Sequence, residues 1–480
     1  MPQPPASKFL IIGAGPTGLG AAYRLKELGI ENFTILDAAD HVGGLAASFK
    51  DAHGFTWDIG GHVQFSHYRY FDEVMARALG EDGWLFHERE SWVWICDRFV
   101  PYPFQNNIRY LPQNEMWKCL KGLIELYKNP VAGRPQNFRE WIHATFGAGL
   151  AEIFMEPYNF KVWAYPPEEM SYEWIGERVA VTDLGRVTKN ILFDLDDLSW
   201  GPNNTFRFPR HGGTGAIWEG VADLIGREKI RLHMPVATIS TPRRTVTLAN
   251  GEQVKYEYLL NTMPLDRLFE SLVESSPELQ ATARQLKFSS SNIVGIGLVG
   301  QKPEALLKKC WMYFPENNCP FYRVTVFSNY SPNNVSYPET QWSLMAEVSE
   351  STAKPVNHKT LIDDIIKGLY ATKLIDDKSQ IVSRWLYRAH HGYPTPSLNR
   401  DAILQKLHNE LEPHNIFSRG RFGGWKYEVS NQDHSFMQGV EWVNRIALGV
   451  PETTYFYPAT ANANWGRLAG APPERFGLCE

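Results

Sequence analysis

The first forty residues combine two short apolar runs with a helical stripe between them. Residues 8–12 and 33–37 are mainly apolar, and short uninterrupted runs of this kind are typical of buried strands. Over 16–28, leucine and alanine recur every three residues, and Gly29 follows as a helix stop. The pattern predicts a β-α-β unit, whose two strands pair in parallel through a right-handed crossover.

The rest of the chain changes its pattern twice. From about 108 to 200, Leu, Ile and Trp recur at spacings of three and four, which predicts helices. From about 230, strand-like runs dominate, and the dipeptide Asn250-Gly251 predicts a hairpin turn. The later runs predict strands of a largely antiparallel sheet, followed by one helix, at 292–299, 310–314, 321–328, 341–348, 380–387 and near 435–448.

The composition limits the classes of partner. The 480 residues include 48 basic and 53 acidic side chains, a net charge of −5. This balance argues against a general nucleic-acid-binding surface, but it leaves room for a local positive pocket. The 16 Trp, 21 Tyr and 26 Phe are many for a soluble chain, so we expect these rings to line either a core or a pocket.

Cysteine usage and hydropathy indicate a compartment. Five cysteines without a C-x-x-C pair are typical of reduced intracellular thiols. No run approaches the roughly 20 apolar residues of a membrane-spanning helix. The first residues also lack the apolar segment of a secretory signal. We therefore expect a soluble cytoplasmic protein with neither a membrane nor a nucleic acid as partner.

Residues 13–18, Gly-Ala-Gly-Pro-Thr-Gly, lie between the first predicted strand and its helix. Gly13 permits a tight turn, Gly15 lets the backbone approach a pyrophosphate, and Gly18 lets the helix pack closely on the strand. The N-terminus of the helix offers its N–H groups to the anion. Asp37 ends the second strand, where a carboxylate accepts hydrogen bonds from ribose hydroxyls. Together these residues predict a dinucleotide site.

Two glycine pairs follow the acidic residue, Gly43-Gly44 and then Gly60-Gly61 just before His62. Glycine has no Cβ, so its backbone can lie flat against a bulky planar ligand. Such pairs resemble the pattern of FAD-binding oxidoreductases rather than that of nicotinamide dehydrogenases. We predict FAD, with two unrelated surface turns as the alternative.

A third glycine-rich stretch, 419–424, precedes the polar run 431–435 and an apolar helix. Polar side chains at this position cap the N–H groups of a helix. A helix N-terminus can equally face a flavin or a phosphate. The sequence leaves both interpretations open.

Arg323 is a cation in the middle of the predicted strand 321–328. Alternation places Arg323 on the same face as Phe321 and on the face opposite to Tyr322. A structural arginine at such a position needs a carboxylate partner, whereas a binding arginine faces an anion. Beside these rings, the guanidinium group suits a nucleotide diphosphate.

Arg178 is a second candidate for the same diphosphate. It lies in a helical stretch rich in aromatic residues, next to Glu173 and Glu177. An ion pair with one of these two acids is the alternative, and position alone favours it.

No metal site is predicted. His62 and His67 are five residues apart, which does not match the spacing of a helical zinc pair. The chain contains no H-E-x-x-H, no G-x-S-x-G and no catalytic-cysteine signature. We interpret His390-His391 as a solvated pair.

Longer motifs give the chain a family resemblance. They include Gly-Gly-His-Val-Gln-Phe-Ser-His-Tyr at 60–68 and Phe-Met-Glu-Pro-Tyr-Asn-Phe-Lys-Val-Trp-Ala at 154–164. Further motifs lie at 100–107, 200–209, 391–396 and 419–437. By these motifs the chain resembles the UDP-galactopyranose mutases of the eukaryotic type over nearly its whole length. It departs mildly at Lys426, where the family has Arg, and at Ser430, where it has Gly.

The resemblance implies an isomerase that interconverts UDP-galactopyranose and UDP-galactofuranose. The reaction uses non-covalently bound FAD that must be reduced, with NADPH as the reductant. A covalent sugar adduct forms on N5 of the reduced flavin, and no net redox change occurs. The segment 331–341 is shorter than in relatives that form tetramers, which favours a monomer.

Two other functions remain as alternatives. A flavin oxidase of the amine or protoporphyrinogen type shares the fold, so the fold alone does not separate it from a mutase. A nucleotide-sugar sensor that holds FAD structurally is the second. We also expect loops near 180–192 and 200–210 to close on the substrate.

The resemblance carries the family's site residues to matching positions, and for Arg178 it replaces the ion pair. The catalytic positions are His62, Arg178 and Arg323. With the fingerprint included, the cofactor-binding positions are Gly13, Gly15, Pro16, Thr17, Gly18, Asp37, Gly44, Leu45, Gly60, Gly61, His62, Val236, Arg421, Asn431, Gln432 and Ser435. The substrate-binding positions are Tyr102, Gln105, Phe154, Tyr158, Asn159, Trp163, Arg178, Asn203, Trp311, Tyr313, Arg323, Tyr330, Tyr393 and Tyr427. Arg89 and Ser91 are implied as an NADPH contact.

These expectations predict an α/β fold in which a Rossmann-like FAD-binding domain carries a helical insertion domain and a mostly antiparallel β-sheet domain. The FAD-binding domain would combine 1–88, 206–265 and 415–480. The helical substrate-binding domain would span 108–205. The sheet domain would combine 89–107 and 266–414.

Overall fold

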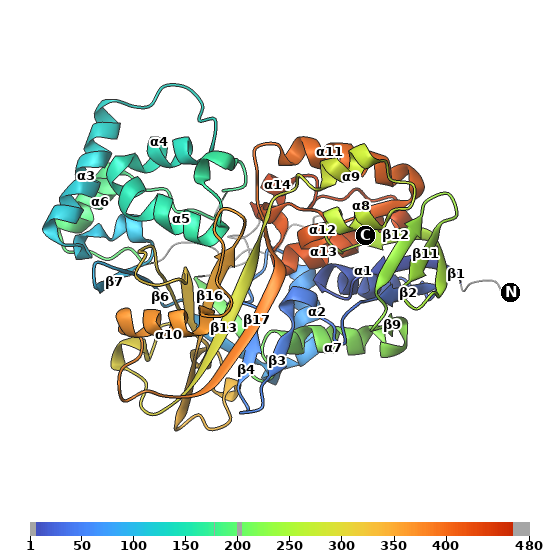
Figure 1. Cartoon of the computed structure of the whole chain (residues 1–480), viewed down its shortest axis with the longest axis horizontal. Coiled ribbons are helices and arrows are strands. Elements are labelled where there is room, and N and C mark those ends of the chain that lie inside the picture. Colours follow the sequence, from blue (N-terminus) through green and yellow to red (C-terminus); the bar gives the residue numbers. More distant parts are fainter. Residues whose placement is uncertain (1–5, 177, 199–203, 464–480) are drawn as a thin grey trace.

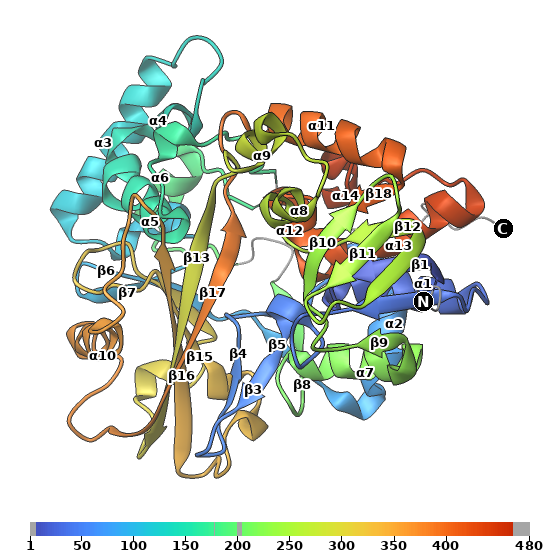
Figure 2. The same cartoon turned by 45° about the vertical axis from the view of Figure 1, so that its right-hand side comes forward.

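The computed structural model describes residues 6–176, 178–198 and 204–463. Two seven-stranded sheets form the main framework of these residues. In both views a group of helices, α3 to α6, lies at one end, away from the sheet that contains β1 (Figures 1 and 2). The long strands β13 and β17 lie between these two regions. The mixed α/β class predicted from the sequence is confirmed.

The predicted β-α-β unit is present. β1 (Ala6–Ile12) pairs in parallel with β2 (Phe33–Leu36), and α1 (Pro16–Glu27) connects them. On its other side β1 pairs in parallel with β12 (Gln253–Asn261), which places β1 at the centre of the sheet. The sheet has the order β10-β11-β12-β1-β2-β9, with β18 also paired to β12. Its remaining strands are β9 (Ile230–Arg231), β10 (Val236–Ser240), β11 (Thr245–Leu248) and β18 (Ile416–Ser418).

The Asn250-Gly251 turn joins β11 to β12 as an antiparallel hairpin, as predicted. The second sheet has the order β17-β13-β16-β15-β14-β6-β7 and is antiparallel except where β14 meets β6. Its strands are β6 (Ser91–Ile95), β7 (Arg98–Pro101), β13 (Phe288–Val299), β14 (Trp311–Tyr313), β15 (Arg323–Val326), β16 (Gln341–Glu350) and β17 (Gln380–Pro394).

Helices cover these sheets and build the separate helical group. α3 (Gln113–Lys128), α4 (Phe138–Leu150), α5 (Glu156–Trp163) and α6 (Leu184–Leu192) share one buried cluster that includes Ile142 and Phe146. α10 (Leu361–Ala371) packs its apolar side chains against the second sheet. Further helices are α2 (Arg69–Leu79), α7 (Gly215–Ile225), α8 (Leu265–Ser271), α9 (Pro277–Ala283), α11 (Arg400–Leu411) and α12 (Gly420–Gly423).

The face assignment within 321–328 is partly wrong. Phe321 packs in the cluster of Val324 and Leu344, not on the face of Arg323. The reason is that β15 begins only at Arg323, so the period-two alternation does not extend back to Phe321 and Tyr322. Arg323 itself lies on the side of the sheet that faces a cavity described below.

The two predicted loops are largely regular structure. Residues 184–192 form α6, because the Asp183 side chain caps its N-terminus by accepting a hydrogen bond from the Arg186 N–H. Residues 205–209 form β8 (Thr205–Pro209), which pairs with β5 (Trp84–Glu88). Asn203 lies outside the described residues. A two-stranded ladder of β3 (Ser48–Lys50) and β4 (Thr56–Asp58) completes the strands.

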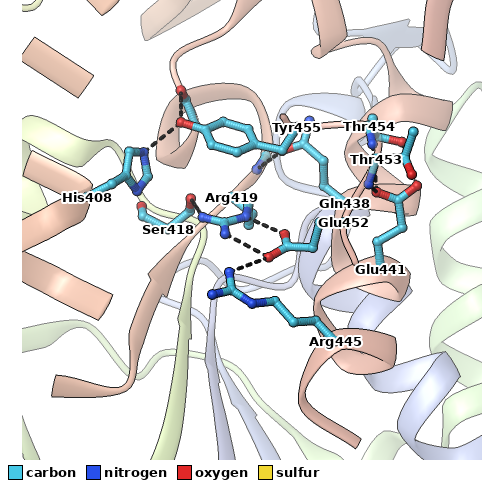
Figure 3. Close-up of polar contacts among 12 residues, drawn as sticks. His408, Ser418, Arg419, Gln438, Glu441, Arg445, Glu452, Thr453, Thr454 and Tyr455 are labelled. Carbon is cyan, nitrogen blue, oxygen red and sulfur yellow. Dashed lines mark hydrogen bonds and ion pairs between the residues drawn. The ribbon is translucent and has the colours of Figure 1, made fainter. Parts of the chain in front are cut away.

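The C-terminal part is fixed by buried charges (Figure 3). α13 (Gln432–Leu448) leads into α14 (Pro458–Asn462). Arg419 donates from Nε and Nη2 to the Glu452 carboxylate at 2.5 and 2.8 Å, and Arg445 donates to the same carboxylate at 3.0 Å. Glu441 accepts the backbone N–H groups of Thr453 and Thr454 at 2.9 and 2.8 Å. These bonds hold residues 452–454 against α13 and against Arg419, which directly follows β18.

Among residues 6–176, 178–198 and 204–463, no helix combines the length and the apolar character that crossing a bilayer requires. The division into an FAD-binding domain, a helical domain and a sheet domain stays a prediction, which we keep as a proposal.

Candidate active site

A cavity of about 820 Å³ is lined by residues of both large sheets and of the first turns of α1 and α13. It gathers almost all of the predicted cofactor positions from distant parts of the chain. These are Gly13, Gly15, Pro16, Thr17, Asp37, Gly44, Leu45, Gly60, Gly61, His62, Val236, Arg421, Asn431, Gln432 and Ser435. Gly18 does not line the cavity, and its role is in packing.

The fingerprint glycines have the predicted geometry. Gly13 has a φ of +105°, which L side chains rarely adopt, and it makes the turn after β1. A Cβ on Gly18 would lie 1.9 Å from the Gly13 carbonyl oxygen, so helix and strand could not pack with any larger residue there. Gly15 begins α1 without a side-chain cap. The first turn of α1 therefore presents backbone N–H groups at the cavity, as an anion site requires.

Asp37 lies at the end of β2 on the cavity wall. Its Oδ2 accepts the Ala14 N–H at 2.6 Å, and its Oδ1 accepts the Ala39 N–H at 2.8 Å. These bonds fix the carboxylate beside the glycine turn. Each oxygen keeps a further lone pair for a ligand hydroxyl.

The first turn of α13 lies on the same cavity. Asn431 precedes the helix, and its side chain makes no capping bond to it. The alternative of an ordinary capped helix is therefore wrong, and the helix N-terminus offers N–H groups and partial positive charge to the cavity. With two uncapped helix N-termini, the glycine turns and Asp37, the residues present fit FAD.

Arg421 is fixed beside this helix. Its Nε and Nη2 donate to the Gly392 carbonyl oxygen at 3.1 and 2.9 Å, and its Nη1 donates to Ser430 Oγ at 2.9 Å. Its guanidinium group lies 4.8 Å from the centre of the Tyr393 ring. Ser430, one of the two departures from the family pattern, thus supplies a hydrogen bond that glycine lacks.

Arg323 and Arg178 both line the cavity. Arg323 makes a two-pronged ion pair with Glu347 at 2.7 and 2.8 Å. Arg178 donates to the Glu428 carbonyl oxygen at 2.6 Å and to Asn462 Oδ1 at 3.5 Å. The predicted ion pair of Arg178 with Glu173 is not present, because Glu173 pairs with Arg134. The other candidate, residue 177, lies outside the described residues.

Five predicted substrate rings line the cavity, and further rings lie behind them. Those on the wall are Tyr102, Trp311, Tyr313, Tyr393 and Tyr427. Behind them Phe154 stacks on Tyr158, whose ring meets Tyr313 at 5.3 Å, and Trp163 meets Tyr427 at 4.7 Å. The Trp311 indole donates to the Tyr313 hydroxyl at 2.7 Å.

Several predicted positions do not reach the cavity wall. Gln105 donates to the Ala180 carbonyl oxygen, and Asn159 donates to the Met155 carbonyl oxygen at 2.8 Å. Tyr330 is buried among aromatic rings, including Phe206 and Phe208. Ser91 is buried too, whereas Arg89 lines the cavity and lies over the Tyr102 ring at 5.3 Å.

Glu347 was not predicted from the sequence. The need of a buried Arg323 for a carboxylate partner could have pointed to it. It is the lone carboxylate inside the apolar run 342–348, and its side chain is 2% exposed. Burial alone would raise the pKa of Glu347. The Arg323 charge, the Tyr322 hydroxyl and the Gly61 N–H outweigh this and hold the pKa below its ordinary value.

The histidine interpretations need correction. The partners of His67 lie far along the chain: its Nδ1 lies 2.6 Å from Asp433 Oδ2, and its ring lies 4.5 Å from that of His434. This contact ties the segment after the Gly60–His62 loop to α13. His391 is not a simple solvated residue, since it pairs with Asp266 at 3.0 Å. Burial lowers the pKa of His62 to about 4, so its ring is neutral.

Comparisons with known proteins show which proteins this chain resembles. The family of flavin containing amine oxidoreductases matches residues 16–424. A crystal structure of reduced UDP-galactopyranose mutase is similar with a TM-score of 0.93 and 50% identity, covering 96% of this chain and 98% of that chain. A putative protoporphyrinogen oxidase from Exiguobacterium sp. 255-15 has a TM-score of 0.70 at 17% identity, covering 92% and 99%, which shows the fold alone. A probable flavin-containing monoamine oxidase A of Dictyostelium discoideum is 23% identical over 272 residues, or 53% of this chain and 57% of that relative.

Proposed function

The chain belongs to the UDP-galactopyranose mutases, within the family of flavin containing amine oxidoreductases, and we propose that it interconverts UDP-galactopyranose and UDP-galactofuranose. It is an isomerase that uses FAD. We also propose that it is of the eukaryotic type, on the motifs at 60–68, 154–164 and 419–437.

One observation carries the substrate assignment. Arg178 and Arg323 lie on the wall of the same cavity as the glycine turns and the first turn of α13. Guanidinium groups bind phosphate oxygens through paired N–H groups. We propose that these two arginines bind the diphosphate of the UDP-sugar, with hydroxyl groups of Tyr313, Tyr393 and Tyr427 beside them. An amine or a porphyrin has no diphosphate and would not need this arrangement.

The chain's own residues would prepare the cofactor end. Reduced FAD bound here would supply the nucleophilic nitrogen that the reaction requires. The N-terminus of α13 favours negative charge nearby. The positive charge of Arg421 is held in the same region by Gly392 and Ser430. His62 is neutral, so we propose that it shapes the site rather than supplying charge.

The decisive experiment uses the purified holoenzyme reduced with dithionite. We expect UDP-galactofuranose to be converted into UDP-galactopyranose, as followed by chromatography with absorbance detection of the uracil. Oxygen-dependent turnover of an amine or a porphyrinogen without this conversion would support the oxidase. UDP binding with neither activity would support a sensor.

We further propose NADPH as the reductant, with Arg89 as a contact for its phosphate. Arg89 lies on the cavity wall, over Tyr102. Anaerobic NADPH should bleach the oxidised flavin faster than NADH does. Arg89→Ala should slow bleaching by NADPH while dithionite reduction stays unchanged. Equal slowing of both nucleotides would argue against a phosphate contact.

Oligomeric state and location remain proposals as well. The short segment 331–341 supports a monomer, which sedimentation velocity would test. The cysteine usage supports a cytoplasmic location, which microscopy of a fluorescent fusion would test.

A further inference from the structure

We propose that Glu347 is a positioning residue that fixes the direction of the Arg323 guanidinium group and ties it to the Gly60–His62 loop. The inference rests on the proposed function, because Arg323 is the arginine proposed to bind the substrate diphosphate. It adds a link between two parts of the site that come from different sheets and loops.

The ion pair of Glu347 fixes the orientation of the Arg323 guanidinium group. Arg323 on β15 and Glu347 on β16 are directly opposite in the antiparallel register. Glu347 Oε1 accepts the Arg323 Nε–H at 2.7 Å, and Oε2 accepts an Nη2–H at 2.8 Å. A guanidinium group has five N–H groups, so three remain for other acceptors. The Arg323 side chain is 21% exposed and lines the cavity, so the pair leaves one edge available there.

The same carboxylate contacts the Gly60–His62 loop. Glu347 Oε1 also accepts the Gly61 N–H at 3.0 Å. A Cβ on Gly61 would lie 2.6 Å from Thr325 Oγ1 and 3.3 Å from Glu347 Oε1, so the loop backbone approaches the sheet closely. The next residue is His62, which lines the cavity and whose Nδ1 makes no hydrogen bond to a described residue. A shift of Arg323 toward an anion would therefore also displace the loop, because the same carboxylate bonds to both.

The Glu347 carboxylate is saturated with hydrogen bonds. The Tyr322 hydroxyl donates to Oε2 at 2.7 Å, so each oxygen of Glu347 already accepts two hydrogen bonds. Two oxygens offer about four lone-pair sites in all. Glu347 thus has no capacity left for a substrate hydroxyl, which is why we assign it a positioning role.

The charge of Glu347 opposes the binding of an anion. It repels a diphosphate, so a residue that served only substrate affinity would not be a carboxylate here. Arg178, by contrast, donates to neutral oxygens of Glu428 and Asn462 and lies 5.7 Å from the centre of the Tyr427 ring. Removing the charge of Glu347 should therefore leave the affinity for UDP equal or higher, while it makes the position of the Arg323 guanidinium group less precise.

The test compares Glu347→Gln with the wild-type holoenzyme. Calorimetry with UDP should give an affinity that is equal to the wild type or tighter by up to roughly tenfold. Turnover of UDP-galactofuranose by the reduced enzyme should fall about 100-fold, since a small misplacement of a binding group has that effect. Turnover within about threefold of the wild type, or a parallel loss of affinity and turnover, would overturn the proposal.

A second readout tests the link to the loop. We expect UDP to perturb the flavin absorption spectrum of the oxidised wild-type holoenzyme. Glu347→Gln should bind UDP and show a much smaller perturbation. No perturbation in the wild type, or an equal one in the variant, would contradict the link. Glu347→Asp is the second variant should glutamine prevent folding, since it keeps the charge but is one methylene too short to span Arg323 and Gly61.

A matched control removes a different arginine-paired glutamate from the same strand. Glu350 is three residues along β16, pairs with Arg388 at 2.9 Å, and does not itself line the cavity; Arg388 does line it and keeps its charge in this variant. Glu350→Gln should leave affinity, turnover and the flavin perturbation unchanged. If it reproduces the effects of Glu347→Gln, the role of Glu347 is only to stabilise the sheet. A wild type that binds UDP with the Glu347-dependent perturbation but never interconverts the sugars would refute the proposed function and leave this inference standing.

Discussion

Arg323–Glu347 and Arg419–Glu452 are two ion pairs with buried carboxylates, nearly the same local chemistry and different surroundings. In each, Nε and Nη2 of the arginine donate to the two carboxylate oxygens. Arg419 is fully buried, and its Nη1 donates to the Ser418 carbonyl oxygen. Arg445 adds a second cation to the same Glu452. All edges of Arg419 thus face protein, whereas one edge of Arg323 faces the cavity.

The difference teaches how to separate a structural arginine from a binding one. A buried charge is tolerated when its partner and its remaining hydrogen-bonding groups are satisfied. Arg419 meets that condition within the protein alone. Arg323 meets it only in part, and the remaining N–H groups point to where an anion can bind. The criterion is the unused donors of an arginine, since both arginines have a carboxylate.

The largest expected effect is on stability at the enclosed pair. Arg419→Ala leaves Glu452 buried with Arg445 as its remaining cation, and we expect the free energy of unfolding to fall by about 3–5 kcal/mol. Urea unfolding of the holoenzyme measures this. The folded fraction should bind UDP with wild-type affinity. A large loss of UDP affinity in that fraction would remove the distinction between the two pairs.

The next effect is on binding at the cavity pair. Arg323→Ala should weaken UDP binding or transition-state stabilisation by about 2–5 kcal/mol, as for a desolvated charged contact. Calorimetry with UDP and steady-state turnover measure the two contributions. Unchanged UDP affinity together with unchanged turnover would show that the exposed edge of Arg323 does not meet the diphosphate.

The stability of the region around Arg419 and Glu452 should depend on pH through the nearby Glu441. Burial raises the pKa of Glu441 from 4.5 to about 7. Between these values the folded state keeps a proton that the unfolded state has lost, so its contribution to stability is full below pH 4.5 and is lost as the pH rises through 7. The total is about 3 kcal/mol. Urea unfolding at several pH values should show Glu441→Gln losing this slope, while UDP affinity at each pH stays that of the wild type.

The smallest expected effect concerns the second arginine of the cavity. Asn462 holds Arg178 and also donates to the Glu428 carbonyl oxygen at 3.0 Å. Asn462→Ala should change UDP affinity by about 1 kcal/mol or less, the net value of a neutral hydrogen bond. Arg178→Ala should cost about 1.5–3 kcal/mol, because a charged donor is lost. Calorimetry with UDP measures both losses of affinity. A larger loss in Asn462→Ala than in Arg178→Ala would contradict this prediction.

Much of the fold was predictable because its signals are local. The apolar runs that became β1 and β2, and the helical stripe between them, depend on residues a few positions apart. The Asn250-Gly251 turn is local as well. The prediction of loops near 180–192 and 200–210 was wrong for 184–192, which form α6 behind the Asp183 cap, and for 205–209, where β8 pairs with the distant β5. Closure of these segments on the substrate stays a prediction.

The cofactor end of the site was predictable for a similar reason. Its glycines occur where the backbone must turn or approach another atom closely, and only glycine fits, as at Gly13 and Gly18. Such requirements leave a pattern in the sequence. The substrate end was found through the resemblance to a family, which implied Gln105 and Tyr330, although neither reaches the cavity wall.

By itself the sequence determined the parallel β-α-β unit, the dinucleotide fingerprint and the presence of two arginines among aromatic residues, because propensity and spacing act over short distances. Only the tertiary structure decided which carboxylate each arginine meets. Glu347 is 24 positions from Arg323 and 286 from Gly61, yet one carboxylate contacts both. The free energy of a buried charge depends on every group around it, and only folding brings those groups together.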